Sequence, residues 1–89
     1  MSKALGSQKA AEHYRAEMVG KRYRHFKGGI YIVTDIAVNT ETEGVMVVYK
    51  DIENPSLVWA RPMRIFLSEV DKNKYPDVKQ ERKFEELVK

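Results

Sequence analysis

The sequence contains no cysteine, so disulfide bonds, thiol nucleophiles and thiolate metal sites are excluded. It also has no long apolar run: uncharged stretches such as Gly28–Thr34 fall far short of the roughly 20 residues that span a bilayer. The first seven residues, Met1–Ser7, lack the apolar centre of a signal peptide. We therefore expect a soluble, cytoplasmic protein with no membrane partner.

The composition is that of one small folded domain. The chain has 89 residues, of which 43% are apolar and 33% are charged, so it can bury one thin core. Composition by itself indicates no activity.

The net charge of +3 is unevenly distributed along the chain. Residues 1–27 carry +5, residues 28–60 carry −4 and residues 61–89 carry +2. The densest basic segment, residues 21–27, alternates cations with aromatic rings, which is one way to contact phosphates and stack on bases. The alternative, which we favour, is a strand whose charges protect a sheet edge from aggregation.

The pattern of apolar residues predicts a helical extension followed by short strands. We expect a disordered segment over residues 1–6, a helix over 7–19 capped by Ser7, and a single small β-barrel domain with a C-terminal extension over 20–89. Within that domain strands are expected over 21–26, 30–38, 45–50 and 57–61, with one helical turn over 63–66. The tail, 78–89, fits a helix or a final strand.

The first hairpin fixes which side chains face the core. Gly28-Gly29 is typical of a two-residue turn, which pairs Phe26 with Tyr31. Phe26 then lies on the same face as Tyr31, and His25 lies on the other face.

We expect the strands to form a strongly bent sheet, closed as a small barrel or roll of about five strands. Its predicted core is Tyr31, Val33, Ile36, Val45, Val47, Trp59 and Phe66.

Several motifs occur in a fixed order: Tyr23-Arg24-His25-Phe26-Lys27-Gly28, Tyr31, Val33, Ala37, Thr40-Glu41-Thr42, Val47-Val48-Tyr49, Trp59, Arg61-Pro62 and Phe66. Together they resemble a bacterial family, the domain-of-unknown-function family numbered 1653. The resemblance covers about residues 20–70, and its closing motif includes Phe84. It implies a small SH3-like barrel and no activity, and the N-terminal helix lies outside it. Asn39 departs from the family, which often has histidine at that position.

Two interpretations of Arg61 are possible, and they depend on whether Trp59 is buried. Trp59 and Arg61 point the same way on a strand. If Trp59 is buried, which we favour, Arg61 also points inward and needs a partner such as Glu41. If Trp59 is exposed, it forms with Arg61 and Tyr49 an aromatic and basic binding surface.

Three functions remain open, and a homodimer is compatible with each. The favoured one is a non-enzymatic interaction module for a protein or peptide partner, by analogy of fold. The alternative is a nucleic-acid-binding domain that uses residues 21–27. An enzyme, which would need His25 beside Glu41 or Asp35 in a cleft, ranks last. No metal, cofactor or catalytic motif is recognisable. The candidate binding surface is Arg24, His25, Lys27, Glu41, Tyr49, Trp59 and Arg61.

Overall fold

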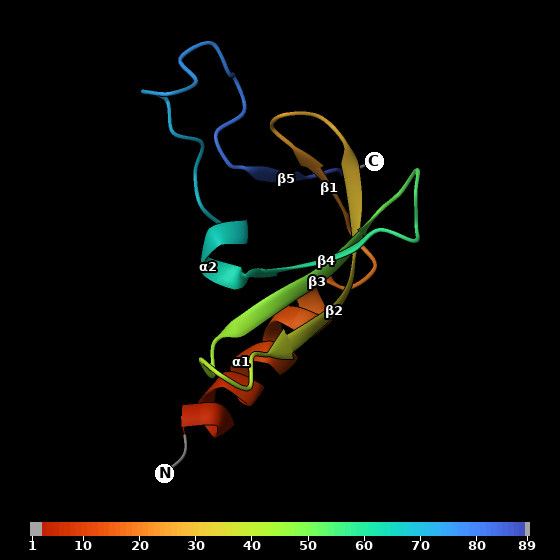
Figure 1. Cartoon of the computed structure of the whole chain (residues 1–89), viewed down its shortest axis with the longest axis vertical. Helices are drawn as coiled ribbons and strands as arrows, with labels where there is room; N and C mark the ends of the chain where they lie inside the picture. The colour runs from red at the N-terminus through yellow and green to blue at the C-terminus, as the bar shows by residue number, and fades with distance from the viewer. Residues whose placement is uncertain (1–2, 89) are drawn as a thin grey trace.

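A computed structural model of the chain describes the backbone of residues 3–88 and the side chains of residues 5–88. The fold is mainly β, with five strands and two helices (Figure 1). In chain order the elements are α1 (Lys3–Met18), β1 (Arg22–His25), β2 (Ile30–Val38), β3 (Val45–Asp51), β4 (Val58–Pro62), α2 (Met63–Phe66) and β5 (Phe84–Glu86).

All five strands belong to one antiparallel sheet with the order β4-β3-β2-β1-β5. The hairpin connections explain why consecutive strands β1 to β4 are neighbours. The tail, which the sequence left open between helix and strand, returns as β5 and pairs with β1. Strands β4 and β5 are therefore the two edges of the sheet.

Helix α1 lies beside β2 and β3 and covers one end of the sheet (Figure 1). It begins at Lys3, so the expected start at Ser7 was wrong; of the segment expected to be disordered, residues 1 and 2 lie outside the described part of the chain. Ser7 is no cap: its hydroxyl donates to the carbonyl oxygen of Glu43 at 2.5 Å. Among the helices of residues 3–88, none has both the length and the apolar content needed to cross a membrane.

The register of the first hairpin differs from the prediction by an odd number of residues. Tyr23, rather than Phe26, is opposite Tyr31, because the turn spans four residues, 26–29, with two glycines at positive φ. An odd shift moves every side chain to the other face. His25 therefore points inward with Tyr23, and Phe26 belongs to the turn.

A β-bulge changes the alternation of side chains in β2. Thr34 is skipped between Val33 and Asp35 in the pairing with β3. Val33 and Ile36 are consequently both buried although they are three positions apart. The same bulge turns Asp35 outward, where its carboxylate accepts a hydrogen bond from Arg15 Nε at 3.0 Å. Arg15 also donates to the carbonyl oxygen of Ile36, and these bonds hold α1 against β2.

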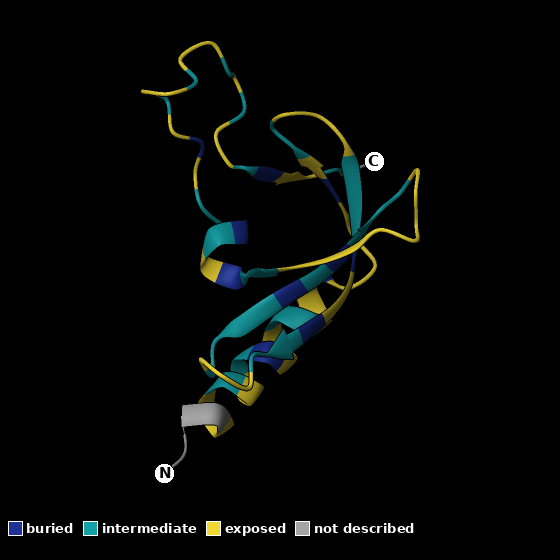
Figure 2. Cartoon of the chain, viewed as in Figure 1, coloured by how far each residue is buried: buried dark blue, intermediate teal, exposed yellow. Residues whose placement is uncertain are grey.

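The centre of the core matches most of the prediction. The largest fully buried side chains are Phe66, Ile36, Val33 and Val47, and Tyr31 and Val45 pack at the margin of the core. The prediction for Trp59 was wrong, because its side chain is 49% exposed. Strand β4 is an edge strand, and Figure 2 shows it as mostly exposed.

Candidate binding site

An aromatic cluster forms the base of the site. The ring of Phe84 stacks on that of Phe66, with 4.2 Å between centroids and 8° between planes. Tyr49 and His25 meet Phe84 edge to face at 5.5 and 4.8 Å. Offset stacks and edge-to-face contacts of this kind stabilise a core beyond the burial of area. The cluster places the imidazole of His25 against a rigid surface.

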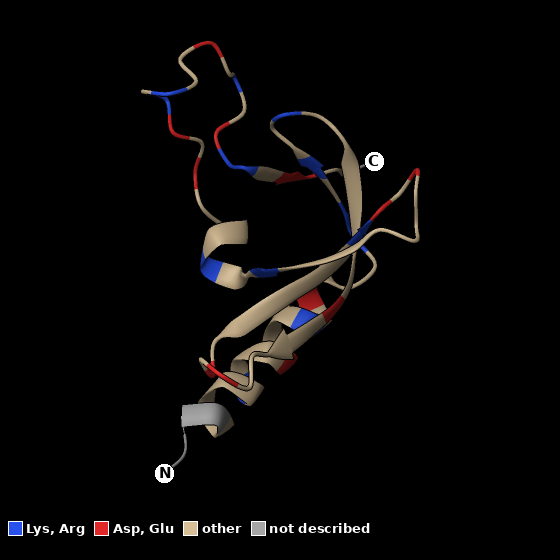
Figure 3. Cartoon of the chain, viewed as in Figure 1, with Lys and Arg blue, Asp and Glu red and all other residues tan. Residues whose placement is uncertain are grey.

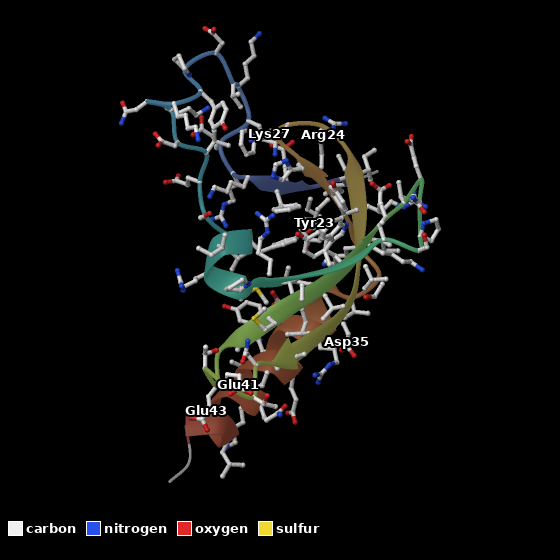
Figure 4. The ribbon with its side chains drawn as sticks, in the orientation of Figure 1. Tyr23, Arg24, Lys27, Asp35, Glu41 and Glu43 are labelled. Carbon is white, nitrogen blue, oxygen red and sulfur yellow. The ribbon has the colours of Figure 1, made fainter. Side chains whose placement is uncertain are left out.

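Arg61, which belongs to β4, packs against the aromatic cluster. The Cζ atom of its guanidinium lies 5.4 Å from the centroid of Phe84, a cation–π contact. The prediction that Glu41 pairs with Arg61 was wrong. No carboxylate in the described part of the chain forms an ion pair with Arg61, whose side chain is only partly exposed. In Figure 4, Glu41 lies near the N-terminal end of the molecule, far from Lys27.

Two adjoining cavities are both lined by His25 and Arg61. The smaller, of about 230 Å³, is lined by His25, Tyr31, Tyr49, Trp59, Arg61 and Phe84. The larger, of about 380 Å³, is lined by His25, Phe26, Lys27, Arg61, Asp71, Lys74, Tyr75 and Lys83. The structure thus brings together five members of the predicted surface: His25, Lys27, Tyr49, Trp59 and Arg61.

We call the larger hollow the cationic cavity, because four basic side chains line it: Lys27, Arg61, Lys74 and Lys83. They come from the β1–β2 turn, from β4 and from the loop before β5 (Figure 3). Lys74, Lys83 and Tyr75 were not among the predicted site residues. Only the return of the tail to β1 places them there, and no local pattern signals that contact.

The basic side chains around the cavity help to lower the pKa values of His25 and Tyr75. Burial, and then the charges of Arg61, Lys27 and Lys83, hold the pKa of His25 below its ordinary value. Its Nδ1 atom accepts a hydrogen bond from the N–H of Lys27 at 3.1 Å, which also suits the neutral imidazole. Hydrogen bonding to Lys27 lowers the pKa of Tyr75.

The basic segment 21–27 does not form one surface. Tyr23 is buried, and burial together with Glu86 and Glu17 raises its pKa to about 12. Arg22 and Arg24 are exposed on the opposite face of β1, while Lys21 approaches Glu86 at 3.9 Å. Within this segment the lysine that reaches the cationic cavity is Lys27. Arg24 therefore stands apart from the rest of the predicted surface.

The arrangement expected for an enzyme is not present in the described residues. Asp35 is held by Arg15 and Glu41 lies in the β2–β3 turn, so neither approaches His25. Over residues 3–88, no three His, Asp or Glu side chains gather in a metal-binding geometry.

The free edge of β4 lies next to the smaller cavity. The N–H of Asp51 donates to the carbonyl oxygen of Leu57 at 3.2 Å. Because hydrogen-bonded pairs alternate along an antiparallel ladder, Trp59 also bonds to β3, and the backbone groups of Val58 and Ala60 point away from the sheet. The apolar residues 57–60 are all exposed: Leu57 by 41%, Val58 by 58%, Trp59 by 49%, and Ala60.

Comparison with known proteins identifies the family and leaves its activity open. The comparison with curated proteins finds no match. A crystal structure of a DUF1653-family protein from Bordetella bronchiseptica is similar, with a TM-score of 0.65 and 25% sequence identity. The similarity covers 82% of this chain and 91% of that one. Residues 21–86, from β1 to the last residue of β5, match the profile of the proteins of unknown function DUF1653. The chain therefore belongs to the DUF1653 family.

Proposed function

We propose that the protein is an interaction module that binds an extended segment of a partner protein as a sixth strand along the edge of β4. The observation that carries this proposal is the run of four exposed apolar residues, 57–60, on an unpaired sheet edge. Natural edge strands are ordinarily short, charged or covered, because a bare edge pairs with other chains. An uncovered apolar edge is therefore typical of an interaction site.

The backbone of β4 supplies the hydrogen bonds that such a partner needs. The N–H and C=O groups of Val58 and Ala60 face outward, two donors and two acceptors in strand geometry. Pro62, which has no N–H, ends the strand and limits the added strand to a short segment. Strand addition of this kind gains affinity from the main chain and specificity from alternate side chains.

Trp59 supplies the anchor for the partner's side chains. It is half-exposed and lines the smaller cavity beside Tyr49. Exposed aromatic residues over a pocket are typical of binding hot spots. Among the side chains of residues 5–88, no carboxylate forms an ion pair with the neighbouring Arg61. The partner segment should therefore combine an apolar residue at Trp59 with an acidic residue near Arg61.

The opposite edge of the sheet is less suited to a partner. Strand β5 has only three residues and exposes Glu85 and Glu86, whose charges discourage pairing. A nucleic-acid interface based on residues 21–27 also has weaker support, because Arg22 and Arg24 point to the other face from the cationic cavity.

A display selection with random peptides, followed by titration of the selected peptides, tests the proposal. Trp59 is the only tryptophan, so its fluorescence reports on this site directly. We expect a blue shift on binding, together with slower amide exchange at Val58 and Ala60. Ala60→Pro removes an outward N–H and leaves the bonds to β3 intact, so it should abolish binding; Ala60→Val retains the N–H and should bind.

Two results would overturn the proposal. One is that selected peptides bind Ala60→Pro as well as the wild type. The other is concentration-dependent dimerisation that Ala60→Pro abolishes, measured by sedimentation velocity, because the partner of β4 would then be a second copy of the chain.

A further inference from the structure

We propose that the cationic cavity binds a phosphate monoester whose ester group carries a planar ring. This site goes beyond the strand-binding edge and does not depend on it. The observation that carries the proposal is the convergence of four cations on one cavity that has a single carboxylate, that of Asp71, among its lining residues.

The charges at the cavity are strongly unbalanced. Asp71 is the only acidic residue among those that line it, and its Oδ1 atom accepts hydrogen bonds from the N–H groups of Asn73 and Lys74 at 3.0 and 3.4 Å. Those bonds hold the carboxylate of Asp71 against the backbone of residues 73 and 74. An uncompensated group of cations repels itself and favours a bound anion.

Two of these lysines lie beside the same aromatic ring. The Nζ atoms of Lys27 and Lys74 lie 5.3 and 5.6 Å from the centroid of the same ring, that of Tyr75. Neither lysine forms an ion pair with a carboxylate among the described residues. An anion within reach of both ammonium groups would gain charge-assisted hydrogen bonds from each.

The donors suit a phosphate group better than a carboxylate. Arg61 offers a planar fork of N–H donors, and the three lysines offer ammonium groups from other directions. A carboxylate has two oxygens in one plane, whereas a phosphate monoester has three terminal oxygens and about two negative charges near neutral pH. Only the phosphate uses donors that converge from three segments of the chain.

The rest of the cavity favours a planar ring. Phe26 and Tyr75 form an edge-to-face pair at 5.0 Å, and His25 lies 4.7 Å from Phe26. The volume of about 380 Å³ is within the range of small-molecule sites, roughly 300–1,000 Å³, and exceeds what a phosphate fills alone. Aromatic side chains beside cations bind the ring and the phosphate of one ligand together.

An amide NMR titration tests the proposal with phenyl phosphate as the probe. Benzoate carries the same ring on a carboxylate, and inorganic phosphate lacks the ring. We expect shifts at Lys27, Lys74 and Lys83, and affinity for phenyl phosphate about tenfold above that for either comparison ligand. Adenosine 5′-monophosphate distinguishes the source: tighter binding than phenyl phosphate identifies a nucleotide, and weaker binding identifies a phosphorylated aromatic side chain.

Variants at exposed or half-exposed cations keep the test independent of folding. Lys74→Gln and Lys83→Gln should each weaken phenyl phosphate about tenfold. Arg22→Gln removes the same charge from the other face of the sheet and should change nothing. The proposal is overturned by the absence of shifts at low salt, by equal affinity for benzoate, or by an equal loss in Arg22→Gln. None of these readouts involves Val58 or Ala60, so failure here is distinct from failure of the peptide site.

Discussion

The guanidinium of Arg61 lies over the ring of Phe84, with 5.4 Å between Cζ and the ring centroid. Arg61 belongs to β4 and Phe84 to β5, the strands at opposite edges of the sheet. One side-chain contact thus bridges two edges that no backbone ladder joins within residues 3–88. It also holds the cation in place between the two cavities.

This contact predicts a modest contribution to stability. We expect Arg61→Gln to lower the free energy of unfolding by about 0.5–1 kcal/mol, the usual range for a cation–π contact near the surface. Urea denaturation measures the change. Arg64→Gln, an exposed arginine on α2, is the control and should have no effect. Equal stability of Arg61→Gln and wild type would show that the contact contributes nothing.

Replacing one buried and one exposed aromatic residue separates the contribution of the core from that of the surface. Phe66 is 1% exposed, so Phe66→Ala should cost about 3–5 kcal/mol by loss of burial and creation of a cavity. Trp59→Ala should cost less than about 1 kcal/mol, because half of the side chain is already in water. Chemical denaturation followed by circular dichroism checks both. A large loss for Trp59→Ala would contradict its position at the edge.

His25 should make stability depend on pH. Its pKa is depressed in the folded state and returns to about 6.5 in the unfolded chain. The unfolded state therefore binds more protons as the pH falls below about 6.5, and the free energy of unfolding decreases until the folded-state pKa is passed. Urea midpoints across this range should fall less steeply in His25→Gln. The control is His13→Gln, on the exposed surface of α1; a slope that changes only in this control would refute the assignment.

Asn39 organises the turn between β2 and β3. Its Oδ1 atom accepts hydrogen bonds from the N–H groups of Glu41 and Thr42, at 2.7 and 3.1 Å. Asn39→Ala should lower the free energy of unfolding by about 1 kcal/mol, because both donors lose their acceptor. Asn39→Asp retains the oxygen and should remain near wild type in thermal denaturation. If both variants lost the same stability, the hydrogen bonds would not be the cause.

Most helices and strands were predicted well, because the residues within each element are enough to indicate its type. Val45–Asp51 is rich in β-branched residues and lies between two strands, as an apolar pattern on both faces indicates. Tyr14 and Met18, four positions apart on α1, pack the helix on the core. The resemblance to the DUF1653 family was also confirmed.

Features that depend on contacts between residues distant in the sequence were predicted less well. The register of the first hairpin depended on whether the turn had two or four residues, and Gly28-Gly29 is compatible with both. The position of β4 at an edge decides the exposure of Trp59, and strand order cannot be read from a pattern within one strand. The cationic cavity depends on the path of residues 71–83, a polar segment without periodicity. For these reasons the site was predicted only in part.

Phe84 is the last core residue in chain order, and its strand completes the pairing of β1. During translation the aromatic centre therefore remains open until residues 84–86 have left the ribosome. At about 5–20 residues per second, β1 exists for seconds with one side unpaired. Arg22 and Arg24 are exposed on that strand, and charges of this kind discourage pairing with other chains. Closure of the aromatic centre thus depends on the strand of the sheet that comes last in chain order.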